Sequence, residues 1–155
     1  MDKIAKYFTY TIIPELNLII EYFSGFVEGN DAIKLKMLEK NDTNYNPRFN
    51  ILVDFRDTII NWTMASDDSL AGFIDFMKES PDLIFNRKTS LLFARPTQAI
   101  LSILLKEQYS KFPIKMGLYS TLDAALINID ISKEYFQKVN EEIEKIRNTS
   151  GIKQV

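Results

Sequence analysis

Three short strand-like runs, each followed by a helix-like segment, constrain the fold of this chain more than any other feature of its sequence. They are "FNILVDF" (49–55), "KTSLLFA" (88–94) and "PIKMGLY" (113–119). The first two have the largely apolar character of strands buried on both faces, whereas the third is more polar and is expected nearer a sheet edge. Because strands that alternate with helices pair in parallel through right-handed crossovers, these runs predict an α/β domain.

The residues before the first of these runs predict a β-hairpin. Residues 7–13 alternate aromatic or aliphatic side chains with threonine, and a second β-rich run covers residues 17–25. Such a hairpin adds one antiparallel strand at an edge of the sheet. The predicted fold is therefore a single α/β domain over residues 1–155, with helices packed on a mixed, mostly parallel sheet of about five strands.

An extra helix is expected at the carboxyl terminus. It covers about residues 132–149 and follows a core of about residues 7–130. Its apolar stripe, which includes Val139 and Ile143, either completes the core of the domain or docks on a second copy of the chain. A homodimer through this helix is therefore one option.

The helix before it begins in "YSTLDAALINI" (119–129). Ser120 and Asp123 have the spacing of a capping box, in which each side chain accepts a backbone N–H from the other's position. Thr121 is the alternative cap if the helix begins one residue later. The segment is expected to be mainly a joint between strand and helix.

The residue types that are absent exclude several classes of enzyme. The chain has no cysteine and no histidine. It therefore lacks thiol nucleophiles, thiolate metal sites and disulfides, as well as histidine as a general base or metal ligand. The sequence contains neither G-x-x-x-x-G-K-[ST] nor G-x-G-x-x-G, so both common phosphate-binding loops are missing. No catalytic residue, metal ion or cofactor is predicted.

Charge and hydropathy limit the classes of partner. The net charge is −2, with lysines and arginines scattered among the acids, so no nucleic-acid binding is predicted. The start of the chain has no apolar segment of signal-peptide length, and the longest apolar helical stretch, "AILSILLKEQY", is too short to cross a bilayer. The sequence predicts no transmembrane segment and a cytoplasmic location.

Three motifs carry a resemblance to a known family. They are "EYFSGFVEGNDAIKLKMLEKND" (21–42), "YNPRFNILVDFRD" (45–57) and "KMGLYSTLDAALINI" (115–129). In order and spacing they resemble the second strand and first helix, the central strand, and the last strand with its helix cap in the STAS family (sulfate transporter and anti-sigma-factor antagonist domains), SpoIIAA-like branch. The resemblance covers about residues 7–130. It implies the fold of that family and a regulatory role exercised through a protein partner.

The resemblance also implies a phosphorylation site. In the anti-sigma-factor antagonists of that family, a partner kinase phosphorylates a serine at the start of the helix after the central strand. The segment "DDSLAG" (67–72) is similar to the family's D-S-S-G-L, with one serine in place of two, and makes Ser69 the candidate. The alternative is that the oxygens of residues 66–69 simply cap the helix.

The carboxyl ends of the parallel strands form the edge at which open α/β sheets usually bind ligands. An arginine beside a helix start suits a carboxylate or phosphate group there. By chain order, the candidates at this edge are Arg56, Asp57, Arg95, Thr97, Ser120 and Thr121. The alternative is that Arg56 pairs with a neighbouring acid while the hydroxyl groups cap helices.

One further candidate, Trp62, lies in "TIINWTMA" (58–65) between the central strand and the next helix. This segment either forms an apolar flap over the ligand edge, with a lipid-like ligand beneath it, or packs against the sheet. A magnesium site at "VDFRD" (53–57) is not expected, because the sequence does not supply further oxygens that converge on one point.

The sequence therefore favours a non-catalytic, cytoplasmic STAS-like module that binds a protein partner, with phosphorylation as its regulation. The second hypothesis, from another class, is a domain that binds a small anionic or lipid-like ligand at the carboxyl edge of its sheet.

Overall fold

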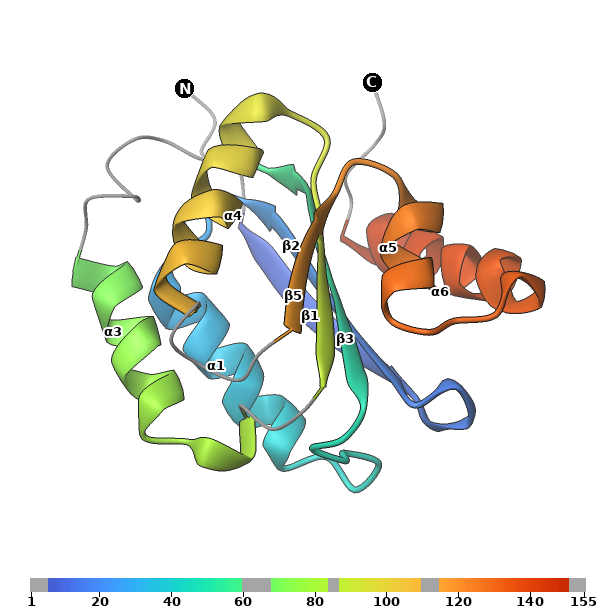
Figure 1. The fold of residues 1–155 in the computed structure, drawn as a ribbon, viewed down its shortest axis with the longest axis horizontal. Helices are drawn as coiled ribbons and strands as arrows, with labels where there is room; N and C mark the ends of the chain where they lie inside the picture. The colour runs from blue at the N-terminus through green and yellow to red at the C-terminus, as the bar shows by residue number, and fades with distance from the viewer. Residues whose placement is uncertain (1–5, 60–67, 84–86, 110–114, 151–155) are drawn as a thin grey trace.

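The fold was analysed in a computed structural model, which describes residues 6–59, 68–83, 87–109 and 115–150. Five strands form one sheet, with helices on both of its faces (Figure 1). In chain order the elements are β1 (Tyr7–Ile13), a 3-10 turn (Pro14–Leu16), β2 (Leu18–Gly25), α1 (Gly29–Lys40), β3 (Asn50–Thr58), α3 (Asp68–Lys78), a 3-10 turn (Pro81–Leu83), β4 (Lys88–Leu92), α4 (Pro96–Tyr109), β5 (Lys115–Tyr119), α5 (Leu122–Asn128), a 3-10 turn (Lys133–Tyr135) and α6 (Phe136–Thr149). The predicted fold class is confirmed.

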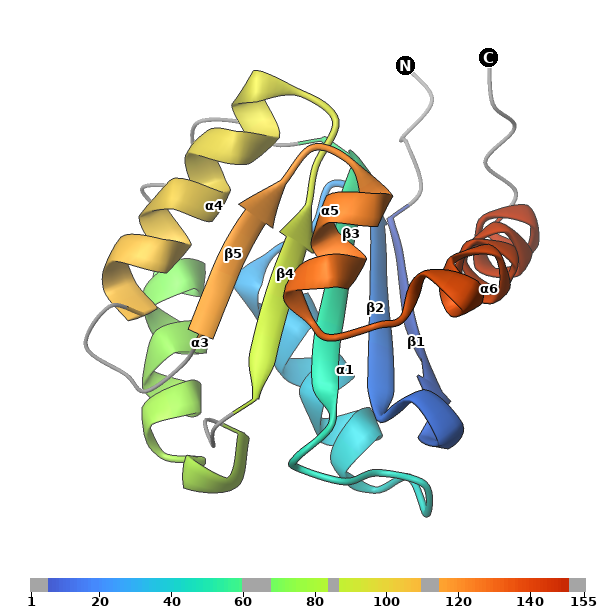
Figure 2. The ribbon, with the colours of Figure 1, turned by 45° about the vertical axis from the view of Figure 1, so that its right-hand side comes forward.

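The strands lie in the sheet in their chain order, β1-β2-β3-β4-β5. The first pair is antiparallel and the other three pairs are parallel. Because each parallel crossover is right-handed and moves one strand in the same direction, the connecting helices α1, α3 and α4 must cover the same face. Helices α5 and α6 follow the last strand and cover the other face (Figure 2).

Each face of the sheet has its own hydrophobic core. Beneath α1, the buried side chains include Ile19, Phe23 and Leu35. On the other face, Ile20 of β2 belongs to the same cluster as Leu126 of α5 and Ile143 of α6. Both Val139 and Ile143 are 0% exposed, so the stripe of the terminal helix completes the core of its own domain.

A cluster of charged side chains is buried under α1. Glu21 of β2 and Lys36 of α1 form an ion pair, and Lys36 Nζ lies 3.6 Å from Glu39 Oε2. Arg87 lies in the segment before β4 and donates to the carbonyl oxygen of Leu83 at 2.9 Å. All four charged groups are at most 6% exposed. The cluster therefore holds two acids and two bases in a region of low dielectric constant.

The acid Glu39 is the least satisfied member of this cluster. It is 0% exposed, and neither of its carboxyl oxygens has a hydrogen-bond partner in the described part of the chain. Burial, followed by the negative charge of Glu21, raises the pKa of Glu39 to about 8, while Lys36 and Arg87 act in the opposite direction. Glu39 is therefore expected to be protonated at neutral pH.

The start of α5 differs in detail from the prediction. The expected capping box of Ser120 and Asp123 is wrong, because α5 begins at Leu122. Its cap is the alternative residue, Thr121, whose side-chain oxygen accepts from the N–H of Ala124 at 3.4 Å. The first helix residue shifts because the cap is selected by backbone geometry and not by sequence spacing alone.

No helix in the described ranges is long and apolar enough to cross a lipid bilayer.

Candidate functional site

The candidate site is the edge of the sheet at the carboxyl ends of β3, β4 and β5. Strand β3 continues three residues beyond the predicted "FNILVDF", to Thr58, so Arg56 and Asp57 are strand residues. The residue Tyr22 of β2 lies opposite Asp54, whereas Ser24 lies opposite Asp57. Two steps along β2 thus match three steps along β3, which is the mark of a β-bulge in β3.

The bulge decides where the two acids point. In a regular strand, residues three apart face opposite sides of the sheet. Because Asp54 and Asp57 are partners of Tyr22 and Ser24, which share one face, the bulge turns both carboxylates toward the α6 face. It therefore brings two negative charges together at the end of β3.

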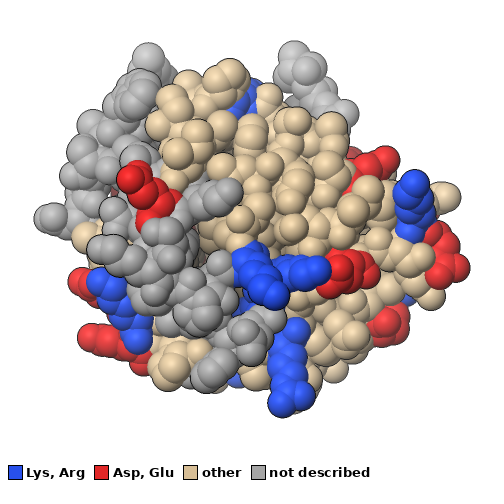
Figure 3. All heavy atoms as spheres, viewed as in Figure 1, with Lys and Arg blue, Asp and Glu red and all other residues tan. Residues whose placement is uncertain are grey.

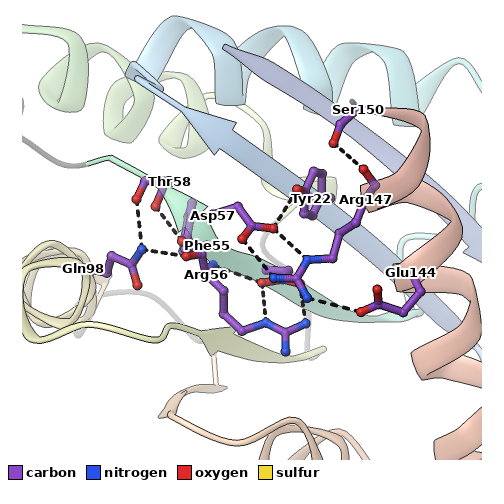
Figure 4. A network of polar contacts seen from close by, with 10 residues as sticks. Tyr22, Phe55, Arg56, Asp57, Thr58, Gln98, Glu144, Arg147 and Ser150 are labelled. Carbon is purple, nitrogen blue, oxygen red and sulfur yellow. Dashed lines mark hydrogen bonds and ion pairs between the residues drawn. The ribbon is translucent and has the colours of Figure 1, made fainter. Parts of the chain in front are cut away.

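Each of these carboxylates is held by an arginine. Arg56 Nε and Nη2 donate to the two oxygens of Asp54 at 3.0 and 2.8 Å. Arg147 of α6 donates through Nε and Nη2 to the two oxygens of Asp57 at 2.7 and 2.9 Å (Figure 4). Both are two-point contacts, the strongest geometry for this pair of groups.

A phenol completes the contact between β2, β3 and α6. The hydroxyl group of Tyr22 donates to Asp57 at 2.7 Å. Burial, and then this hydrogen bond, raise the pKa of Tyr22 to about 12, so the phenol stays neutral at physiological pH. Burial alone would raise the pKa of Asp57 as well, but the hydrogen bonds from Arg147 and Tyr22 outweigh it and hold that pKa below its ordinary value.

The amide of Gln98 joins the start of α4 to the end of β3. Its nitrogen donates to the carbonyl oxygens of Arg56 and Thr58 at 3.0 and 2.9 Å. Its oxygen accepts from the backbone N–H groups of Ala94 and Arg95 at 2.8 and 3.0 Å. The side chain is 1% exposed, so it is a structural connector and is not available to a ligand. We call this group of residues the edge network: Tyr22, Asp54, Arg56, Asp57, Gln98 and Arg147.

Truncation of Gln98 to alanine is expected to lower the free energy of unfolding by about 1–2 kcal/mol, because four backbone groups lose their partner and water replaces only some of these hydrogen bonds. Urea denaturation of Q98A measures this loss. The matched control is T97A, since Thr97 is the exposed neighbour, and it should change stability by less than about 0.5 kcal/mol. Equal losses in the two variants would contradict the role given to Gln98.

The sequence-predicted residues separate into two groups. Arg56 and Asp57 belong to the edge network, and the alternative in which Arg56 pairs with a neighbouring acid holds, with Asp54 as that acid. The residues Arg95, Thr97, Ser120 and Thr121 are exposed around the starts of α4 and α5.

The other two candidates lie partly or wholly outside the described residues. Ser69 is the second residue of α3, and its side chain falls outside the described part of the chain. Trp62 also lies outside the described residues, so the proposed flap is not tested.

Four members of the edge network were not among the sequence-predicted site residues: Tyr22, Asp54, Gln98 and Arg147. For Arg147 a signal was present. It lies four residues after Ile143, and therefore on the buried stripe of the terminal helix, where an arginine needs an acid as partner. Gln98 and Tyr22 carried no comparable signal.

The chemistry open to the edge network is limited. Both carboxylates are engaged by guanidinium groups, and the phenol is neutral, so the network does not hold a ready general base or nucleophile. In the described ranges, no group of three or more acids is placed to hold a metal ion. Comparison with known proteins adds no assignment, since no protein-family model matches the sequence and no curated protein matches it either.

Proposed function

We propose that this chain is a non-catalytic, cytoplasmic STAS-like module that binds a protein partner on the β5 side of its sheet, the surface formed by α4, β5 and α5. One observation carries the proposal. Among the described residues, a broad area in the middle of this side has no charged side chains (Figure 3); the exposed charges of β5 and α5 are Lys115 at the start of the strand and Asp123 in the first turn of the helix. Neutral, partly apolar surfaces are typical of the centres of protein–protein interfaces.

Exposed isoleucines on both helices that flank β5 support this choice of surface. Ile127 of α5 is 56% exposed, and on α4 Ile103 and Ile100 are 54% and 36% exposed. Single apolar side chains are common on protein surfaces, but here they lie on either side of one edge strand. The edge network supports the same proposal. The acids at the end of β3 are ion-paired with arginines of the same domain, so these charges are not available to a partner.

The family assignment is part of the proposal. The motifs that carry the resemblance correspond to β2 with α1, to β3, and to β5 with α5, in that order along the chain. In the anti-sigma-factor antagonists of the family, phosphorylation controls binding of a protein partner. We extend this to Ser69, at the start of α3, where a phosphate would lie beside the positive end of the helix dipole. Intact-mass measurement of the chain from its native cells tests this step, and a chain without phosphate under all growth conditions would remove it.

Replacing Ile127 by lysine is expected to abolish partner binding while leaving the fold intact, because a charge is placed on the exposed face of α5 without disturbing its buried face. The matched control is Met37→Lys on α1. Met37 is 54% exposed and, like Ile127, lies in the last turn of its helix, where lysine suits the dipole. Quantitative affinity capture from native lysate compares the two variants with the wild-type chain.

The proposal predicts that a protein retained by the wild-type chain and by M37K is lost from I127K. The result that would contradict it is the same set of proteins on all three baits, or a loss with M37K alone. Melting temperatures of the purified variants confirm that both remain folded.

The exposure of Arg95, Thr97, Ser120 and Thr121 around the starts of α4 and α5 favours a second candidate function, the binding of a small anionic or lipid-like ligand. Inorganic phosphate and a fatty acid are suitable probes. If either raises the melting temperature of the wild-type chain and not that of R95A, the ligand-binding function replaces the protein-binding one; the leading proposal predicts no shift in either protein.

A further inference from the structure

The amino-terminal strand β1 is an open edge of the sheet without the usual protection. Within the described part of the chain it pairs with β2 alone, so alternate residues turn their N–H and C=O groups away from the sheet. Natural edge strands carry charges, proline or a bulge that prevent pairing with another chain. The seven residues of β1, "YFTYTII", include no charge, glycine or proline, and their register with β2 is unbroken.

The opposite edge is different. Strand β5 has five residues, begins with Lys115 and contains Gly117. The ring of Tyr119 folds back over this glycine, so that a Cβ added there would meet the ring carbon Cε2 at 2.5 Å. A short strand with a charge and a glycine is a poorer template for pairing than β1.

The side chains of β1 extend an apolar surface to its open edge. The rings of Phe55, Phe23 and Phe8 form a row across β3, β2 and β1, with centroid separations of 5.3 and 6.4 Å. The row ends at Phe8, which is only partly buried. Beside it, the hydroxyl group of Tyr10 donates to the carboxylate of Asp42 at 2.9 Å, and the Leu38 side chain is 56% exposed. Among the described residues, this apolar surface thus ends at the open edge of β1.

We propose that β1 pairs with β1 of a second copy of the chain, antiparallel and about a twofold axis at Tyr10, to join two five-stranded sheets. This register places Phe8 opposite Ile12 of the second copy and Thr9 opposite its Thr11. The row of rings then meets the apolar side chain of Ile12 across the axis, and the outward N–H and C=O groups of both strands are paired. A closed twofold pair also consumes both open edges, so it does not propagate.

The charges at the two ends of β1 are compatible with this arrangement. Lys6 precedes the strand and Glu15 follows it, and each is ion-paired within its own chain, Lys6 with Asp31 at 3.0 Å and Glu15 with Lys138. Antiparallel pairing brings the lysine end of one copy to the glutamate end of the other. Parallel pairing would bring lysine to lysine and glutamate to glutamate. A second copy in the antiparallel sense is therefore the occupant that pairs both open edges without placing like charges at the same end.

The absence of cysteine from the chain allows a direct test of the register. A single cysteine at position 10 lies on the twofold axis, within disulfide reach of its copy, whereas cysteine at position 12 faces residue 8 and is too far from its own equivalent. Under mild oxidation, Tyr10→Cys is expected to form a covalent dimer. The controls Ile12→Cys and Ser120→Cys are expected to stay monomeric on a denaturing gel.

A charge exchange provides a second, independent test. Thr9 and Thr11 are both replaced by lysine in one variant and by glutamate in another. The proposal predicts that the wild-type chain and S120K sediment as dimers, that each double variant is monomeric, and that an equal mixture of the two forms a one-to-one heterodimer. A wild-type chain that is monomeric at high micromolar concentration overturns the proposal. A dimer that persists in both double variants overturns it as well. In the disulfide test, covalent dimers of equal yield from all three cysteine variants would also overturn it. This pairing is independent of the proposed function, because the I127K substitution is expected to leave it unchanged.

Discussion

Replacing Glu39 by glutamine is expected to remove most of the stability loss that the wild-type chain undergoes as the pH rises from about 5 to about 8. Burial, and then the charge of Glu21, raise the pKa of Glu39 to about 8. A carboxyl group whose pKa is raised on folding stabilises the folded state fully below its unfolded pKa, and the contribution disappears as the pH rises through the folded pKa. The wild-type chain should therefore lose about 3–5 kcal/mol over this range, whereas glutamine cannot ionise.

Urea denaturation at a series of pH values measures this effect. The matched control is Glu79→Gln, an exposed position just after α3, which should run parallel to the wild-type profile. The difference in unfolding free energy between E39Q and the wild-type chain should grow in favour of E39Q as the pH rises. Parallel profiles for E39Q and the wild-type chain would show that Glu39 is ionised in the folded state and that the buried cluster is organised differently.

The second large effect is expected at Arg147, whose replacement by alanine should lower the free energy of unfolding by about 2–3 kcal/mol. The substitution leaves Asp57 without the two hydrogen bonds that compensate its burial. The value lies below that of a fully buried pair, because the side chains of Arg147 and Asp57 are 15% and 17% exposed. The matched control is Lys145→Ala, which removes an exposed ion pair from the same helix and should change stability by less than about 0.5 kcal/mol.

A double-mutant cycle with Asp57→Asn isolates the pair. If Arg147 and Asp57 stabilise the fold through each other, the two substitutions should couple by about 2 kcal/mol.

The contribution of Asp57 to stability depends on pH with the opposite sign to that of Glu39. Because the pKa of Asp57 is lowered on folding, its contribution is present above the unfolded pKa and is lost as the pH falls through the folded pKa. The anchoring role of Arg147 would be contradicted if the two substitutions had additive effects on the free energy of unfolding and if the loss of stability at acidic pH were the same in the variants as in the wild-type chain.

The order of strands and helices was predictable because each strand has a local signature. β3 is nearly continuous in apolar residues, and β1 alternates apolar residues with threonine. These patterns predict that both segments are strands, and they predict whether each strand lies inside the sheet or at its edge. The layers then follow from the handedness of the crossovers, without further information from the sequence. The terminal helix is similar, since Val139 and Ile143 already mark its buried face.

Helix α1 shows where such reasoning fails. Ile33 and Met37 lie one helical turn apart, as on an apolar face, yet Met37 is 54% exposed while Lys36 and Glu39 are buried. The inward face of α1 is selected by Glu21, which lies on a different element and projects into the same core. A buried ion cluster of this kind reverses the usual rule that charges mark the solvent face, and it is visible only when both elements are placed.

The location of the candidate site could be predicted from the sequence, but the contacts within it could not. The carboxyl ends of the strands follow from the topology, and Arg56 and Asp57 lie there. The bulge that turns Asp54 and Asp57 to one face depends on how β3 pairs with β2, and the contact of Asp57 with Arg147 joins residues that are 90 positions apart. Neither follows from local pattern.

The most direct test of the proposed function is photo-crosslinking from single positions on the β5 side. A photoreactive phenylalanine analogue placed at Ile127 or at Ile103 reports which protein touches that surface in native lysate, and the same residue at Met37 serves as the control. We predict that positions 127 and 103 yield adducts with one and the same partner protein and that position 37 does not. Adducts with that partner from position 37 alone, or indistinguishable labelling from all three positions, would contradict the proposal that the β5 side of the sheet is the binding surface.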